Sequence, residues 1–175
     1  MIYTSTYKSP LGEMLMASDG TYLIGLWFEK QKYYGSKLLD ETKEDNNLEI
    51  FKQTKQWLDK YFNGEQPNHL DLPLKPQGTK FRLLVWDILL KIPYTQTIRY
   101  GDIAKEVALK LNKPTMSAQA IGGAVGHNPI SIIIPCHRVV GSDKSLTGYA
   151  GGLDRKVELL KYENVDLNQF KKVGE

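Results

Sequence analysis

Only one cysteine, Cys136, occurs among the 175 residues, and no apolar run is long enough to cross a membrane. A single thiol cannot form an internal disulfide, which argues against a disulfide-stapled secreted scaffold. The first ten residues, MIYTSTYKSP, lack the charged start and apolar core of a signal peptide. These absences favour a cytoplasmic protein without a membrane partner.

Metal-ligand patterns are also missing. The three histidines, His69, His127 and His137, and the lone cysteine include no pair at the spacing typical of zinc sites. We therefore expect no metal site in this chain.

Net charge is small, at +3, but it is unevenly distributed. The first 79 residues carry a net charge of −2 and the remaining residues a net charge of +5. The second half is therefore the part that could bind a polyanion such as nucleic acid. An excess of this size is more often an ordinary solvated surface, so charge alone does not decide the partner.

The first half of the sequence has a β pattern followed by one helix. Residues 1–30 alternate between apolar and polar and predict an antiparallel meander, with Asp19-Gly20 as a tight hairpin turn. Residues 31–47 are polar and predict a loop. Apolar residues at helical spacing predict a helix over 48–62. Residues 63–78 are rich in proline and glycine and indicate a linker with one short strand around 70–72.

The second half is mainly helical. Thr79 is a good N-cap for a helix that Pro93 ends, and a second helix begins near Tyr100. A third helix runs from Ser117 to Gly126, and a last one from Leu153 to Glu163. The second and third helices have the outline of a helix-turn-helix unit, although plain helical hairpins are far commoner.

The third of these helices, SAQAIGGAVG, is unusually rich in glycine. Each glycine costs a helix about 1 kcal/mol relative to alanine, so a bare surface must serve a purpose. Close packing of another element is the commoner purpose, and close approach to a nucleic acid is the alternative.

The stretch IIIPCHRVVG places Cys136 after a strand-like apolar run and directly before His137. A lone cysteine is usually a small buried hydrophobe, but an adjacent imidazole can activate a thiol as a nucleophile. Neighbours in sequence do not face each other on a helix, so their contact needs an irregular turn or a bridging water. These residues alone leave hydrolase, transferase and redox sensor open.

Three motifs together resemble the O6-alkylguanine-DNA alkyltransferase family. They are PCHRVVG, the preceding GHNPISIII and the following GYAGGLDRKVELLKYE, and the resemblance runs from about 78 to 165. It implies an α+β fold with two parts. Residues 1–77 would form a small ribonuclease-H-like antiparallel sheet lobe with one helix. Residues 78–175 would form a mainly helical domain with a helix-turn-helix and the active cysteine.

The resemblance also implies a reaction. Members of this family bind the minor groove of duplex DNA, flip out O6-alkylguanine and transfer the alkyl group to a cysteine of their own. The transfer occurs once per molecule and needs no cofactor. Flipping is required because the O6 atom is inaccessible inside the base stack.

Residue roles follow from the same resemblance. Cys136 corresponds to the alkyl acceptor, His137 to the base that activates it through a water, and Glu163 to the carboxylate that orients this base. Asn128 corresponds to the residue that ties the DNA-binding helix to the active-site segment. Tyr100 corresponds to the tyrosine that contacts the flipped nucleotide.

Further substrate- and DNA-binding positions complete the implied site. Tyr149, Ala150 and Gly151 would close over the base, and the carbonyl of Val139 would accept a hydrogen bond from the guanine amine. The remaining positions are Gln119, Ala120 and Gly122 on the glycine-rich helix, and Arg138 in the motif itself.

Two departures from the family pattern stand out. Many members have an arginine that fills the gap left by the flipped guanine, whereas this chain has the uncharged Gln119. We therefore expect a weaker hold on DNA, partly recovered by Arg99, Lys110 or Lys113. Some members also bind a structural zinc through N-terminal cysteines, which this chain lacks.

Two alternatives to DNA repair by alkyl transfer remain at this point. An alkyltransferase-like protein that binds lesions without chemistry would lack the acceptor cysteine, so Cys136 argues against it. A cysteine hydrolase would turn over repeatedly. We expect a monomer in solution, and the sequence leaves open whether several copies bind DNA cooperatively.

Overall fold

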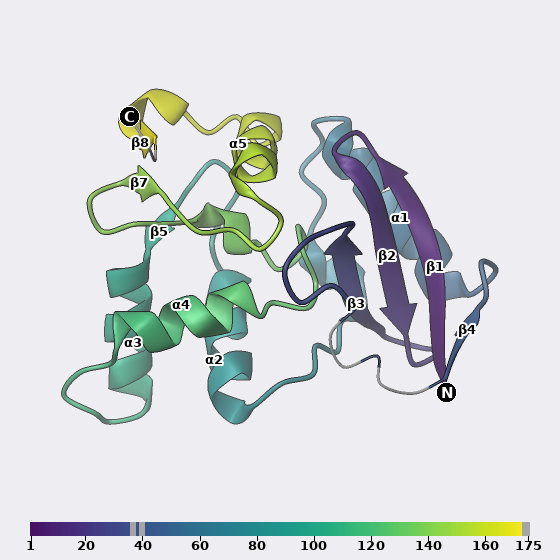
Figure 1. Ribbon diagram of the computed structural model, residues 1–175, viewed down its shortest axis with the longest axis horizontal. Helices are drawn as coiled ribbons and strands as arrows, with labels where there is room; N and C mark the ends of the chain where they lie inside the picture. Colours follow the sequence, from purple (N-terminus) through teal and green to yellow (C-terminus); the bar gives the residue numbers. More distant parts are fainter. Residues whose placement is uncertain (36–37, 39–40, 173–175) are drawn as a thin grey trace.

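The computed structural model describes residues 1–35, 38 and 41–172, and shows a sheet lobe beside a helical part (Figure 1). The sheet contains β1 (Ile2–Ser9), β2 (Gly12–Ser18), β3 (Leu23–Phe28) and β4 (Thr42–Glu44), in the order β3-β2-β1-β4. The first three strands pair antiparallel, which confirms the predicted meander, and β4 pairs parallel with β1. Helix α1 (Glu49–Phe62) buries Phe51 and Leu58 and contacts β1, β2 and β3.

The turns of the meander differ from the prediction. The two-residue turn lies at Pro10-Leu11, because Ser9 pairs directly with Gly12. Asp19 and Gly20 belong instead to a four-residue loop, since Ser18 pairs with Leu23. The Asp19 carboxylate accepts hydrogen bonds from the backbone N–H groups of Thr21 and Tyr22 and so orders this loop.

Two further expectations for the first half were wrong. The segment 31–47 is not entirely loop, because β4 lies within it; residues 36–37 and 39–40 lie outside the described residues. The strand expected around 70–72 is the 3-10 helix η1 (His69–Asp71), capped by the Asn68 side chain. The strand-like contact of this linker comes later, where Leu74 bridges to Leu23 at the edge of the sheet.

The helical part matches the predicted order of helices. It contains α2 (Lys80–Leu89), α3 (Tyr100–Lys110), α4 (Ala118–Gly126) and α5 (Leu153–Tyr162). The side chains of Thr79 and Ser117 accept hydrogen bonds from Arg82 N and Ala120 N, and so cap α2 and α4 as expected. Residues 111–117 join α3 to α4, a longer connection than the three or four residues of a typical helix-turn-helix.

Short elements complete this part of the chain. They are β5 (Ile98–Arg99), η2 (Cys136–Arg138), β6 (Val139–Val140), β7 (Ser145–Leu146), η3 (Leu167–Gln169) and β8 (Lys171–Lys172). Strand β5 pairs with β6 and β7 with β8, both parallel. The pairing of β5 with β6 places the start of α3 beside the residues that follow Cys136.

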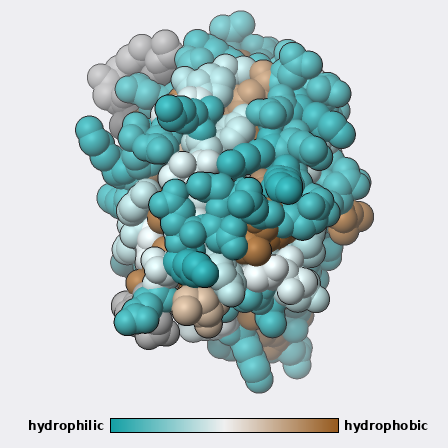
Figure 2. Space-filling model, turned by 90° about the vertical axis from the view of Figure 1, so that its right-hand side faces the viewer, coloured by the Kyte–Doolittle hydropathy of each residue, from teal (hydrophilic) through white to brown (hydrophobic). Residues whose placement is uncertain are grey.

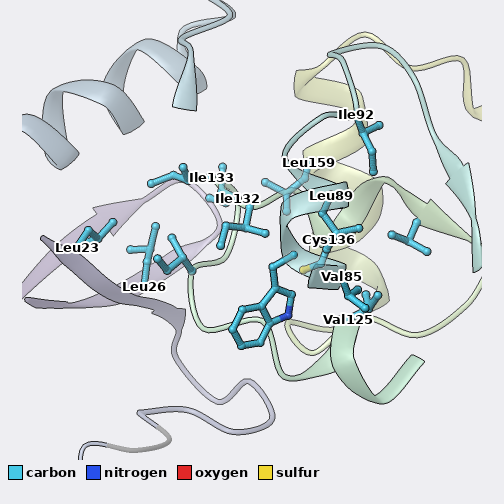
Figure 3. Packing of buried hydrophobic residues seen from close by; sticks show 14 of the residues in the cluster. Leu23, Leu26, Val85, Leu89, Ile92, Val125, Ile132, Ile133, Cys136 and Leu159 are labelled. Atoms are coloured by element: carbon cyan, nitrogen blue, oxygen red, sulfur yellow. The ribbon is translucent and has the colours of Figure 1, made fainter. Parts of the chain in front are cut away.

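The isoleucine run before Cys136, residues 130–134, is not a regular strand. It makes one isolated bridge, from Ile130 to Leu26 of β3, and the backbone of Ile132 turns into the left-handed region with a φ of 70°. The run is buried where the two parts of the chain meet (Figure 3). Ile132 and Ile133 lie between Leu26 on the sheet side and the cluster around Cys136 on the helix side, so one core spans both parts.

The outer face of the sheet lobe is mostly hydrophilic, with only scattered apolar residues (Figure 2). No helix in the described part of the chain is long and apolar enough to cross a membrane. The architecture is α+β, with the sheet and most of the helices segregated along the sequence, as expected.

Candidate active site around Cys136

Cys136 begins the short helix η2 and lies at the floor of a cavity of about 210 Å³. Only 4% of the residue is exposed. Burial raises the pKa of its thiol to about 11, although a hydrogen bond with Asn128 and the charge of Lys156 act in the opposite direction. The thiol is therefore protonated at neutral pH, and the site must remove its proton before the sulfur can act as a nucleophile.

A buried carboxylate, Glu163, lies behind the cysteine segment at the C-terminal end of α5. One of its oxygens pairs with Nε2 of His137, and the other accepts a hydrogen bond of 2.6 Å from Nε of Arg138. Burial favours a higher pKa for Glu163, but His137 and Arg138 outweigh it and lower the pKa to about 2. Glu163 is therefore ionised at neutral pH.

His137 is fully buried beside this carboxylate. Burial lowers the pKa of its imidazole, and Arg138 and Lys156 add to this effect while Glu163 opposes it. We take the ring as neutral at neutral pH. With Nε2 held by Glu163, its Nδ1 atom has no hydrogen-bond partner among the described residues. This unoccupied nitrogen can accept a proton, as a base requires.

Asn128 links the end of α4 to the cysteine segment. Its side-chain amide donates to the carbonyl of Ile134 over 2.8 Å and accepts from the backbone N–H of Ile130 over 3.0 Å. Because both bonds are buried, they fix the irregular turn that carries Cys136 to the cavity floor.

Comparison with known proteins identifies the chain. The ribonuclease-like domain of the 6-O-methylguanine DNA methyltransferases matches residues 2–76, and the DNA binding domain of the same proteins matches residues 80–165. The chain belongs to this family.

Individual relatives agree along nearly the whole chain. A methylated-DNA–protein-cysteine methyltransferase of Haemophilus influenzae is 41% identical over 164 residues, which are 94% of this chain and 87% of the relative. The protein of the same name in Methanosarcina acetivorans is 41% identical over 93% of this chain and 98% of its own. The crystal structure of Mycobacterium tuberculosis OGT in complex with DNA superposes with a TM-score of 0.80, at 37% identity, over 96% of this chain and 94% of that one. The family resemblance and the fold class are thus confirmed.

Four of the residues expected to bind the substrate line the cavity. They are Tyr100, Gly122, Tyr149 and Ala150. Gly151 follows in the same loop, where a Cβ atom would lie 2.6 Å from the Tyr149 ring, so only glycine lets this ring take its place. Gln119 and Ala120 do not line the cavity and are exposed in the first turn of α4.

Arg138 and Val139 both make hydrogen bonds within the protein. The guanidinium of Arg138 donates to Glu163 and to the carbonyl of Ile92 over 2.5 Å, and lies 4.4 Å from the centre of the Tyr94 ring. This side chain belongs to the carboxylate cluster and does not line the cavity of Cys136. The Val139 carbonyl already accepts one hydrogen bond, from Lys156, and its second lone pair remains for a further donor.

The glycines of α4 do not serve the packing of another element. A Cβ atom added at Gly122, Gly123 or Gly126 would meet no atom within 4 Å. The commoner explanation for a small-residue helix, close packing within the protein, therefore fails for these positions. A bare outer helix surface suits close approach by a partner such as DNA.

Lys156 is a buried residue near the site that sequence reasoning missed. Its ammonium group donates to the carbonyls of Val139, Thr147 and Gly148 over 2.6, 3.0 and 3.3 Å, and so ties α5 to both backbone segments beside the cavity. Burial lowers its pKa to about 8. Lys156 shares the buried face of α5 with Leu159 and Leu160, a spacing that could have revealed it.

The sheet lobe also reaches the carboxylate cluster. Tyr61 of α1 is buried and donates its hydroxyl to Glu163 over 2.6 Å. In the sequence Tyr61 fitted the apolar face of its helix, and nothing marked it as a partner of a residue 102 positions away. Glu163 therefore accepts hydrogen bonds from Tyr61, His137 and Arg138, and the donor Tyr61 belongs to the sheet lobe.

Proposed function

We propose that this protein repairs O6-alkylguanine in double-stranded DNA by transferring the alkyl group irreversibly to the sulfur of Cys136. The observation that carries the proposal is the only thiol of the chain at the floor of a cavity, with a buried Glu163–His137 pair behind it. Membership of the 6-O-methylguanine DNA methyltransferase family supports the same reaction.

Activation of the thiol follows from the charges of the site. Nδ1 of His137 takes the thiol proton, through a bridging water because no direct hydrogen bond joins this nitrogen to the thiol. The ionised Glu163 stabilises the imidazolium that forms and holds the ring through Nε2. Arg138 and Tyr61 keep this carboxylate charged and in place.

The transfer itself is a single displacement. The thiolate attacks the alkyl carbon, the new S–C bond forms as the C–O6 bond breaks, and guanine leaves with the bonding electrons and takes up a proton. Burial raises the pKa of Tyr100 to about 12, so its hydroxyl keeps its proton and can donate a hydrogen bond to the leaving base. The thioether product is inert, which limits each molecule to one transfer.

DNA would bind along α4. The exposed residues Gln119 and Ala120 and the bare glycine surface suit insertion into the minor groove, with the flipped base entering the cavity beside Gly122. Arg99, Lys110 and Lys113 are exposed nearby in sequence and would contact phosphates. Such binding depends on the backbone more than on the sequence of the DNA, as a protein that searches for lesions requires.

The test is the intact mass of the protein before and after incubation with a duplex containing one O6-methylguanine. We expect a gain of one methylene, about 14 Da, limited to one per molecule and absent in Cys136→Ser. Binding of the lesion duplex without a mass gain would show a lesion-binding protein instead, and continued turnover of an ester substrate would show a hydrolase. The monomeric state and the cytoplasmic location stay predictions.

A further inference from the structure

The segment that follows β3 in the sheet lobe reaches the cavity of Cys136. In Figure 1 this loop lies on the side of the sheet that faces the helical part. The buried Gln31 anchors it, because its side-chain oxygen accepts hydrogen bonds from Phe28 N over 2.7 Å and from the Ser131 hydroxyl over 3.1 Å. The backbone N–H of Lys32 donates to the carbonyl of Ala150 over 3.0 Å. The segment is thus attached both to the isoleucine run and to the active-site loop.

Tyr33, the next residue, stacks on His127 at the end of α4. The ring centres are 3.8 Å apart and the planes differ by 24°. The His127 ring is itself held by a hydrogen bond of 2.7 Å between Nδ1 and the carbonyl of Gly123. The backbone of Tyr33 has a φ of 60°, a left-handed conformation that is unfavourable for a bulky residue and persists only where the surroundings impose it.

Both rings line the same cavity as Cys136. Tyr100 and Gly148 are neighbours in the lining, since a Cβ atom at Gly148 would be 3.4 Å from the Tyr100 hydroxyl. Along α4, His127 follows Gly122 by five residues, which is about 7.5 Å of helix. If the base enters beside Gly122 and Tyr100, the space towards Tyr33 and His127 is left for the group on O6.

We propose that Tyr33, held against His127, limits the size of the alkyl group that Cys136 can accept. The proposal rests on the proposed function and assigns a specificity role to the sheet lobe. A methyl group needs only the space next to the sulfur. A benzyl group has to extend further along the cavity, towards the wall to which the half-exposed Tyr33 ring and His127 contribute.

The test compares two leaving groups on the full-length protein. Duplexes that differ only in carrying O6-methylguanine or O6-benzylguanine are reacted under single-turnover conditions, and both transfers are followed by intact mass. The readout is the ratio of the benzyl to the methyl rate constant. Both constants are measured on one preparation, so a fraction of misfolded protein cancels in the ratio.

We expect Tyr33→Ala to raise this ratio by about 10-fold or more, the scale on which a steric pocket discriminates. His127→Ala should raise it as well, because Tyr33 loses the ring that holds it. Tyr33→Phe keeps the ring and should keep the parent ratio. The control is Tyr34→Ala, which removes a neighbouring ring that is 49% exposed and is not part of the cavity wall.

An unchanged or lower ratio in Tyr33→Ala, relative to Tyr34→Ala, would overturn the proposal. Failure of the proposed function is a different result, because the parent protein would then gain neither a methyl nor a benzyl group.

Discussion

The two parts of the molecule contribute to the site in different ways. The helical part provides every group with a proposed chemical step: the thiol of Cys136, the imidazole of His137, the carboxylate of Glu163 and the hydroxyl of Tyr100. The sheet lobe provides groups that hold these in place, above all the Tyr61 hydroxyl on Glu163. A reactive motif in one part of a chain can therefore depend on contacts from another part that has no reactive residue of its own.

The largest effect should come from removing the general base, His137, from the helical part. His137→Ala should slow alkyl transfer by about 10²- to 10⁴-fold, because general-base assistance is worth that much. Single-turnover transfer from the O6-methylguanine duplex measures it. His69→Ala is the control, since His69 lies outside the cavity of Cys136. An equal rate in the parent and in His137→Ala would show that His137 is not the general base.

Lowering the pH should destabilise the folded protein through the buried groups of the helical part. The pKa of Glu163 falls from 4.5 to about 2 on folding and that of His137 falls below 6.5, so the unfolded chain binds more protons as the pH drops. Stability from these groups is therefore present above pH 6.5 and lost on acidification, with Glu163 accounting for about 3 kcal/mol between pH 4.5 and 2.

Urea unfolding at a series of pH values measures this loss. The Glu163→Gln variant should show a flatter profile between pH 4.5 and 2, since the carboxylate responsible is gone. Parallel profiles for the two proteins in that range would contradict the assignment to Glu163.

A third change tests whether the reacting part also needs internal supports. Lys156→Met removes one buried hydrogen bond, to Val139, and two part-buried ones, to Thr147 and Gly148, which should cost about 1–3 kcal/mol in the free energy of unfolding. Displacement of the active-site loop should slow transfer by about 10- to 100-fold. Lys161→Met is the matched control, because Lys161 is an exposed lysine on the same helix. If both variants had the same free energy of unfolding and the same transfer rate, Lys156 would not stabilise the active-site loop.

The smallest effect concerns DNA binding, which we assign to the helical part alone. Gln119→Arg adds one exposed cation to the first turn of α4 and should tighten binding several-fold at low salt. The slope of log affinity against log salt should steepen by about 0.9, the value for one additional phosphate contact. Fluorescence anisotropy with an undamaged duplex measures both. An unchanged slope would show that residue 119 does not face a phosphate.

The sequence predicted the reacting part far better than the supports. Cys136, His137 and Glu163 could be placed because they belong to motifs, and Thr79 and Ser117 because capping is local in sequence. Tyr61 could not be placed because it lies on the apolar face of α1, where the sequence marks it only as a core residue. Lys156 was overlooked, although its spacing with Leu159 and Leu160 puts it on the buried face of α5. Tyr33 contacts His127 only because the sheet lobe packs against the helical part, which no local pattern shows. The strand expected at 70–72 is absent because the Asn68 side chain caps a 3-10 helix there.

A double-mutant cycle on Tyr61 and Glu163 tests the central claim that the sheet lobe acts through the carboxylate of the helical part. Tyr61→Phe should slow single-turnover transfer about fivefold, the equivalent of one hydrogen bond of about 1 kcal/mol. In the Glu163→Gln background the same change should have less than about a twofold effect. Tyr7→Phe, which deletes an exposed tyrosine–aspartate hydrogen bond in the same lobe, should leave the rate unchanged. A fivefold loss in both backgrounds would contradict the account, because Tyr61 would then act independently of Glu163.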